Sequence, residues 1–161
     1  MKKMMIILLM AFLLFLLEFF LFNFLGKAFL PNLLLLLVTF TALEVGRYQA
    51  LAVALFAGFI KDSFTLSPVG TYMFSFVICA FLISRLQKYI FHEASVLTRL
   101  VVVLAVCLCN FFVQYLLHTR FMDIVWTQAI KHVLFPELIV TLLVAVPVFK
   151  QLHKCVLKSF V

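Results

Sequence analysis

Long apolar runs separated by short polar breaks extend along the whole chain. A helix that crosses the hydrocarbon core of a bilayer needs about 20 apolar residues, and about 17 is the usual lower limit. The first, fifth and sixth runs reach this length, whereas the second and third are shorter and are divided by Gly46-Arg47. We interpret these two runs as a tight helical hairpin. The pattern predicts six helices, at residues 4–25, 29–43, 48–60, 69–84, 100–117 and 133–149.

The composition places these helices in a membrane. Of the 161 residues, 67% are hydrophobic and 12% are charged, whereas soluble domains average about 45–50% apolar and about 25% charged residues. A soluble fold of this size has too little interior to bury so much apolar surface. We therefore predict an all-α, polytopic integral membrane protein in which residues 1–161 form one transmembrane domain.

The first apolar run follows Lys2 and Lys3, in the manner of a secretory signal peptide. The run continues to about Leu25, which is longer than the usual core of a signal peptide, and no A-x-A cleavage site follows it. We interpret this run as an uncleaved first transmembrane helix.

The basic residues predict the orientation in the membrane. Six spans put both termini on one side, and Lys and Arg are enriched on the cytoplasmic side. With the N-terminus inside, nine of the 13 basic residues lie in inner segments and four in outer segments. Both termini are therefore predicted to be cytoplasmic. The inner residues are Lys2, Lys3, Arg47, Arg85, Lys88, Arg99, Lys150, Lys154 and Lys158, and the outer ones are Lys27, Lys61, Arg120 and Lys131.

Two peripheral segments have a pattern of their own. In residues 150–161, Lys150, Lys154 and Lys158 recur every four residues opposite an apolar row. This pattern predicts a basic amphipathic cytoplasmic tail that lies on the membrane surface and meets anionic lipid. We attribute the net charge of +7 to such contacts and predict no nucleic-acid partner. The outer loop, residues 118–131, is rich in apolar residues and is predicted to lie in the interface or to pack on a partner.

The stretch GFIKDSFTLSPVG, residues 58–70, interrupts the apolar pattern. One interpretation is a solvated outer turn, in which Lys61-Asp62 ends the third helix at the headgroup level and Ser67-Pro68 begins the fourth. The other is a polar site within the membrane. The pattern favours the solvated turn.

Several polar residues lie within the apolar runs. Ionisable groups in a membrane normally face the bundle interior or a partner, because contact with lipid is costly. One interpretation is an outward-opening pocket for a small ligand, built from Glu18, Asp62, Asn110, Gln114 and Glu137. The favoured interpretation is hydrogen bonding between helices and contact with another membrane protein. The candidate residues for this outer polar cluster are Glu18, Asn110, Gln114, His118 and Glu137.

Sequence signatures of catalysis are absent. The chain has no Gly-rich phosphate loop, no H-E-x-x-H and no G-x-S-x-G. Its histidines are scattered, and its four cysteines have neither zinc spacing nor a disulfide framework. We predict that the protein is not an enzyme and has no cofactor and no metal site.

A series of short motifs resembles the MreD family of bacterial rod-shape-determining proteins. The resemblance covers roughly residues 5–155 and departs from the family at Ala54, Ala57, Lys61 and Glu137. The motifs are PNLLLLLV with Pro31 and Asn32, then Gly46, GFIKD with Gly58 and Asp62, SPVG with Gly70, and VLFPE with Pro136.

The resemblance implies a non-enzymatic membrane scaffold of the rod, or elongation, complex in the bacterial cytoplasmic (inner) membrane. Such a scaffold would serve cell shape and lateral peptidoglycan synthesis. The implied partners are an MreC-like bitopic protein, a RodA-type glycosyltransferase with its transpeptidase, membrane lipids and, indirectly, MreB filaments. The family also resembles the S-component bundle of energy-coupling-factor transporters. A vitamin-binding S component is therefore the alternative function.

Overall fold

The computed structural model describes residues 2–25, 30–65, 70–90, 96–118 and 135–158. These ranges hold six helices and no strand, which confirms the all-α prediction. The helices are α1 (Lys2–Leu25), α2 (Leu33–Glu44), α3 (Arg47–Phe64), α4 (Thr71–Ile90), α5 (Val96–His118) and α7 (Phe135–Lys158).

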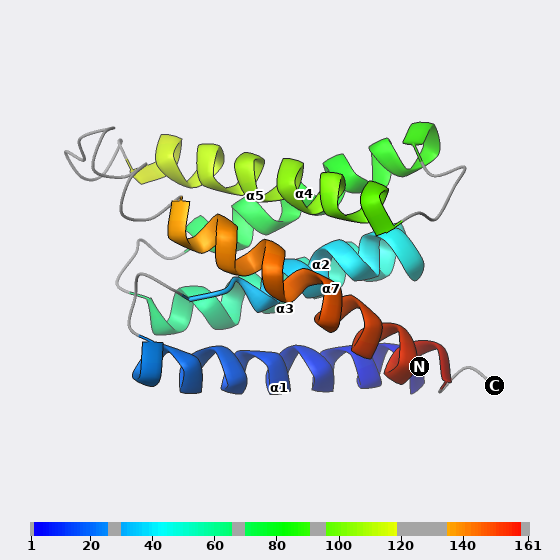
Figure 1. The fold of residues 1–161 in the computed structure, drawn as a ribbon, viewed down its shortest axis with the longest axis horizontal. Coiled ribbons are helices and arrows are strands. Elements are labelled where there is room, and N and C mark those ends of the chain that lie inside the picture. Colours follow the sequence, from blue (N-terminus) through cyan, green and yellow to red (C-terminus); the bar gives the residue numbers. More distant parts are fainter. Residues whose placement is uncertain (1, 26–29, 66–69, 91–95, 119–134, 159–161) are drawn as a thin grey trace.

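Successive helices run in opposite directions along one bundle (Figure 1). The bundle end at which α1 begins and α7 ends is called the inner end below, after the distribution of basic residues, and the opposite end is called the outer end. The breaks between α2 and α3 and between α4 and α5 lie at the inner end. This alternation agrees with the hairpin expected around Gly46, whose φ of 141° is a conformation that side chains rarely adopt.

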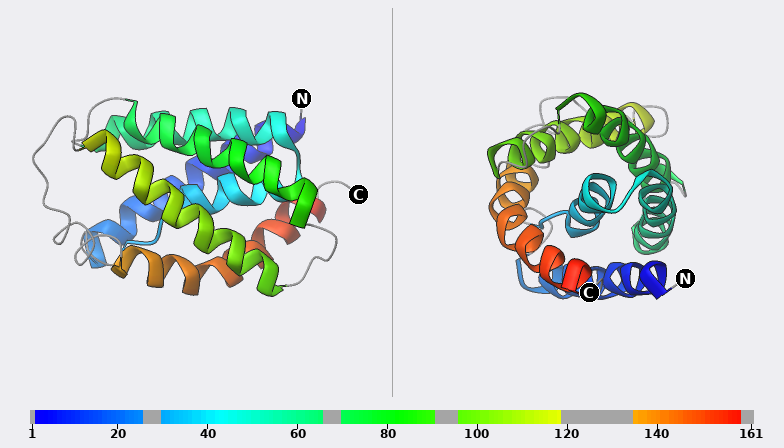
Figure 2. Two further views of the ribbon diagram at one scale, coloured as in Figure 1. Left: turned by 90° about the horizontal axis from the view of Figure 1, so that it is seen from above. Right: turned by 90° about the vertical axis from the view of Figure 1, so that its right-hand side faces the viewer.

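The short helix α2 lies in the centre of the bundle (Figure 2). Every residue from Leu33 to Leu43 is buried, and α2 contacts each of the other five described helices. A helix that is hydrophobic on all sides is stable only in such an enclosed position. Its 12 residues span about 18 Å, less than the roughly 30 Å of the hydrocarbon core. At least one end of α2 is therefore expected to lie within the membrane.

The outer faces of the surrounding helices are apolar. Leu13 and Phe20 on α1, Leu108 on α5 and Leu143 on α7 expose between 43% and 71% of their surface. A soluble monomer rarely exposes so much continuous apolar surface, whereas lipid is a suitable solvent for it. By length and composition, Met4–Phe24 and Thr98–Leu117 are the two described segments that could cross a membrane, and Leu33–Glu44 and Thr71–Gln87 are shorter apolar helices.

Helices α3 and α7 extend beyond the apolar runs. Helix α3 continues to Phe64, past Lys61-Asp62, and α7 continues without a break to Lys158 through Pro147. Residues 150–158 thus extend α7 in the structure. Lys150 and Lys154 are exposed, and the side chain of Lys158 lies outside the described residues. A separate surface tail at 150–161 stays a prediction, as does the placement of the outer loop, of which residues 119–131 also lie outside.

Candidate functional site

The first turn of α2 is buried and still has hydrogen-bond partners. Helix N-termini leave four backbone N–H groups without partners inside the helix. The N–H of Leu33 donates to the Pro31 carbonyl at 3.0 Å, and that of Leu36 donates to the Asn32 carbonyl at 3.2 Å. The Asn32 side chain caps the helix, because its Oδ1 accepts from Leu35 N at 3.3 Å. The remaining N–H, of Leu34, lies 3.5 Å from Glu18 Oε2 on α1.

Lys61 of α3 joins this helix end to Glu18. Its Nζ lies 2.7 Å from Glu18 Oε1 and donates to Asn32 Oδ1 at 2.9 Å. Only 12% of the Lys61 side chain and 7% of the Glu18 side chain are exposed. The ammonium also lies 5.2 Å from the centre of the Tyr72 ring, a cation–π distance. Glu18 further benefits from the positive N-terminal end of the α2 dipole.

Helix α7 contacts the N-terminal end of α2 through two side chains that lie one helical turn apart. Asn32 donates its Nδ2 to Glu137 Oε1 at 2.9 Å and its backbone N–H to Thr141 Oγ1 at 3.1 Å. Four helices therefore meet at Asn32. We call Glu18, Asn32, Lys61, Glu137 and Thr141 the α2 cap network.

Asp62, the neighbour of Lys61, caps a different helix. Its Oδ2 accepts from the backbone N–H groups of Gly70 and Met73 at 3.0 and 3.1 Å, and its Oδ1 accepts from that of Tyr72 at 3.0 Å. Only 4% of Asp62 is exposed. Gly70 has a φ of 99°, which a glycine adopts without strain. The carboxylate thereby joins the last turn of α3 to the first turn of α4.

The solvated turn expected at Lys61-Asp62 is wrong. Both side chains face the bundle interior, because each has partners there that are themselves buried: Glu18 and Asn32 for the lysine, and the start of α4 for the aspartate. The apolar pattern alone could not distinguish a charged pair that ends a helix from one that points inward. Residues 66–69 of this stretch, with Ser67-Pro68, lie outside the described residues.

Gly58 sets the distance between α3 and α4. A Cβ at this position would lie 2.3 Å from Met73 Cα and 2.7 Å from Met73 N, which are backbone atoms that cannot turn aside. Ala54 and Ala57 are buried on the same helix. Small residues allow helices in a membrane to approach closely, and this approach places Asp62 within reach of the α4 N-terminus.

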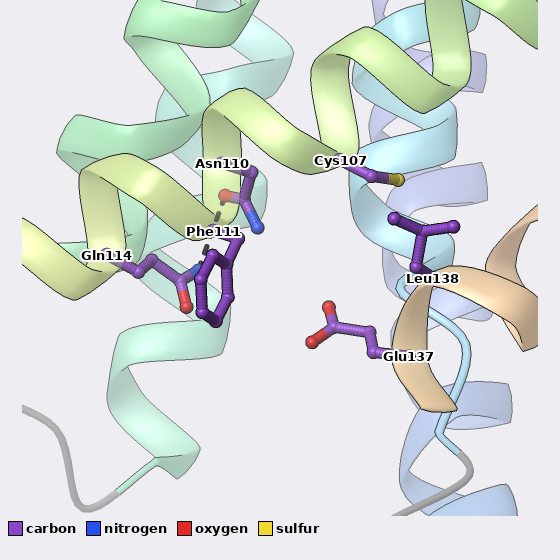
Figure 3. Close-up of a pocket in the computed structure, with 6 residues that line it drawn as sticks. All are labelled: Cys107, Asn110, Phe111, Gln114, Glu137 and Leu138. Carbon is purple, nitrogen blue, oxygen red and sulfur yellow. Dashed lines mark hydrogen bonds between the residues drawn. The ribbon is translucent and has the colours of Figure 1, made fainter. Parts of the chain in front are cut away.

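The remaining outer polar residues form a second, smaller group on α5. Asn110 Oδ1 accepts from Ser75 Oγ on α4 at 2.7 Å and from Gln114 Nε2 at 3.3 Å. Glu137 faces this group across a small cavity (Figure 3). The cavity volume is about 20 Å³, which is enough for about one water molecule. The side chain of His118 lies outside the described residues.

Lys61 and Thr141 were not among the predicted site residues, although Asn32 and Glu137 were. The pattern places Lys61 in the headgroup region, because it follows a short apolar run. The sequence spacing could have identified Thr141, because it follows Glu137 by four residues and therefore lies on the same helix face. Pro136 is the second residue of α7, a position in the first turn that tolerates proline; its side chain lies outside the described residues.

The inner end of α2 also has polar partners. Gln87 Nε2 of α4 donates to the Leu43 carbonyl at 2.6 Å, and Arg99 Nη2 of α5 lies 2.8 Å from Glu44 Oε1. The C-terminal carbonyls of a helix need such donors. Polar side chains from neighbouring helices thus hold both ends of α2, which fixes its depth in the bundle.

This arrangement is suited to joining helices and leaves little room for chemistry. The polar atoms of the α2 cap network contact one another, and the cavity beside Glu137 accommodates only a water molecule. Among the described residues, no group of three or more His, Cys, Asp or Glu side chains could hold a metal ion.

Comparison with known proteins assigns the chain to a family. Residues 1–155 match the sequence profile described as rod shape-determining protein MreD. The chain is 33% identical over 95 residues to the rod shape-determining protein MreD of Bacillus subtilis (strain 168), a match that covers 57% of this chain and 55% of that protein. The chain thus matches about half the length of this curated relative, and no solved structure matches it. The profile covers nearly the whole chain, including the α2 cap network and Asp62. The protein therefore belongs to the MreD family of membrane proteins.

Proposed function

We propose that the protein is a non-enzymatic membrane scaffold of the bacterial rod complex, with a role in cell shape and lateral peptidoglycan synthesis. The observation that carries this proposal is the use of polar groups inside the bundle. Glu18, Lys61, Asn32 and Glu137 contact one another and the backbone of α2, so they stabilise one arrangement of helices. Because the chain belongs to the MreD family, we assign this bundle a role in rod shape determination.

In this proposal the chain passes through the cytoplasmic membrane six times, with α2 as a short pass that has at least one end within the membrane, and both termini lie in the cytoplasm. The antiparallel succession of helices in Figure 1 supports an even number of spans. The apolar outer faces of α1 and α5 offer contact to lipid and to transmembrane helices of partners. The proposed partners are an MreC-like bitopic protein and a RodA-type glycosyltransferase with its transpeptidase, with MreB filaments contacted indirectly.

A vitamin-binding S component is not supported. Pockets for small molecules usually have volumes of about 300–1,000 Å³, whereas the cavity between Asn110, Gln114 and Glu137 has about 20 Å³. The carboxylates that such a pocket would need are engaged by Lys61 and Asn32. Within the described residues, the outer polar groups therefore serve contacts between helices.

The proposal is tested by isolating the tagged protein from its native membrane in a mild detergent and identifying the bound proteins by mass spectrometry. Co-isolation of an MreC-like protein and lateral-wall synthases is the expected result. A tagged, unrelated polytopic protein from the same membrane is the control for proteins that bind without specificity. Recovery of a pair of ATPases with a transmembrane coupling subunit, and of no wall synthase, would overturn the proposal.

A further inference from the structure

A groove at the inner end of the bundle has no role in the function proposed above. It lies between the first turns of α5 and the last turns of α7, and its cavity volume is about 530 Å³. The floor is apolar and includes Val103, Ala145 and Phe149. Figure 1 shows α5 and α7 diverging toward the end of the bundle where α7 terminates, and residues of both helices line the groove.

Four basic side chains line the same groove, namely Arg99 of α5 and Lys150, His153 and Lys154 of α7. Arg99 forms an ion pair with Glu44 through Nη2, at 2.8 Å. Lys150 and Lys154 are exposed, and among the described residues no salt bridge engages them. The groove therefore has a surplus of positive charge beside an apolar floor.

Arg99 has a further unused donor. In the described part of the chain, its Nε is buried and has no hydrogen-bond partner. Buried polar atoms in native proteins nearly always have a partner, and each exception calls for an explanation such as strain, a functional role, or a bound water or ion. Arginine is well suited to phosphate, because its planar group presents several donors in a fixed geometry.

We infer that this groove binds one anionic glycerophospholipid of the surrounding leaflet. Its phosphate would lie among Arg99, Lys150 and Lys154, and an acyl chain would cover Val103 and Val146. The amphipathic lining fits a lipid better than a soluble phosphate, which would gain nothing from the apolar floor. The charge surplus selects an anionic headgroup over a zwitterionic one.

Native mass spectrometry of the purified full chain in detergent, titrated with phosphatidylglycerol or phosphatidylcholine, tests this inference. We expect one tightly retained phosphatidylglycerol and weak binding of phosphatidylcholine. The double variant Lys150→Gln/Lys154→Gln should weaken phosphatidylglycerol binding by about thirtyfold, since each of the two charges removed near the headgroup contributes about 1 kcal/mol. Glycerol phosphate, which has the headgroup chemistry without acyl chains, should not displace the lipid.

Two further variants separate the groove from general surface charge. Arg47→Gln/Arg85→Gln is the matched control, because it removes two charges that both lie over the Phe81 ring, outside the groove. It should retain the lipid. Val146→Trp should fill the groove and expel the lipid without a change of charge, since Val146 is 46% exposed and its replacement does not disturb the core. Equal loss in both double variants, retention in Val146→Trp, displacement by glycerol phosphate or equal binding of phosphatidylcholine would each overturn the inference.

Discussion

At the scale of single residues, two adjacent charges on α3 serve opposite partners. Lys61 contacts Glu18 and Asn32 at the start of α2, and Asp62 accepts three backbone N–H groups at the start of α4. Consecutive residues on a helix point about 100° apart, as expected from 3.6 residues per turn. A single turn of α3 can therefore support two neighbouring helices, which explains why a charged pair lies so close to apolar residues.

Replacement of Lys61 by methionine should destabilise the bundle, because it leaves the Glu18 carboxylate buried without its ammonium partner. Loss of one member of a buried pair typically costs about 3–5 kcal/mol. The α2 dipole offsets part of this, so we expect about 2–3 kcal/mol. Thermal unfolding in detergent measures the effect, and Arg85→Met, the loss of an exposed basic side chain outside the groove, is the control.

The double variant Glu18→Gln/Lys61→Met identifies the cause of that loss. Because the buried charge is removed together with its partner, the double variant should be more stable than Lys61→Met alone. If the double variant is as unstable as the sum of the two single variants, Glu18 and Lys61 act independently and the ion pair is not what stabilises this site.

Replacement of Asp62 by alanine should weaken the junction between α3 and α4. Loss of an N-cap side chain costs about 0.5–2 kcal/mol, and because Asp62 accepts from three N–H groups, we expect a cost at the upper end of this range. Asp62→Asn, which keeps one carbonyl oxygen, should have an intermediate effect. The level of assembled protein in the membrane is the measurement, and Ser63→Ala, at an exposed neighbour, is the control. Wild-type assembly of Asp62→Ala would contradict this role.

At the scale of helices, the short central helix α2 accounts for the positions of several buried polar residues. An enclosed helix with an apolar surface on every side has its unpaired backbone groups only at its ends. Glu18, Asn32 and Thr141 lie at one end, and Gln87 and Arg99 at the other. One set of the polar side chains within the bundle thus lies where α2 begins and ends, whereas Asp62 and Asn110 serve contacts of α4.

Substitution of Gly58 by alanine should push α3 and α4 apart. In a helix, alanine is more favourable than glycine by about 1 kcal/mol. The new Cβ, however, would lie 2.3 Å from Met73 Cα. Overpacking of this kind costs about 1–3 kcal/mol. Because the atoms in the way belong to the backbone, we expect this cost to exceed the gain in helix propensity and the variant to be less stable. Thermal unfolding compares Gly58→Ala with Leu55→Ala, a change at an exposed position of the same helix. Increased stability of Gly58→Ala would show that the helices can separate without cost.

The sequence was sufficient to predict the helical class and the approximate positions of the helices, because apolar runs are long and their breaks are charged. It also indicated Asn32, Asp62 and Glu137 as residues of interest. It could not show that Lys61 points inward, since periodicity near a helix end does not define which face is buried. Nor could it show that Glu18 and Glu137, 119 positions apart in the chain, meet around Asn32, because such a meeting depends on how helices pack.

At the scale of the whole molecule, the structure combines a polar interior at the outer end with a basic surface at the inner end. The α2 cap network and the Asp62 cap lie where α2 and α4 begin, and Arg47, Arg85, Arg99 and Lys150 lie toward the opposite end. Basic residues near the ends of transmembrane helices are retained on the cytoplasmic side. This asymmetry supports an orientation with the inner end in the cytoplasm.

Reporter fusions test that orientation together with the proposed number of spans. A fluorescent protein fused after Val161 should fold and fluoresce, because the C-terminus is expected in the cytoplasm, whereas alkaline phosphatase at the same position should be inactive. Phosphatase inserted after Asp123, in the predicted outer loop, should be active. An insertion after Phe91, in the predicted inner segment, is the matched internal control and should be inactive. Active phosphatase at Val161 with active phosphatase at Asp123 would mean that α7 does not cross the membrane, and the even number of spans would then be wrong.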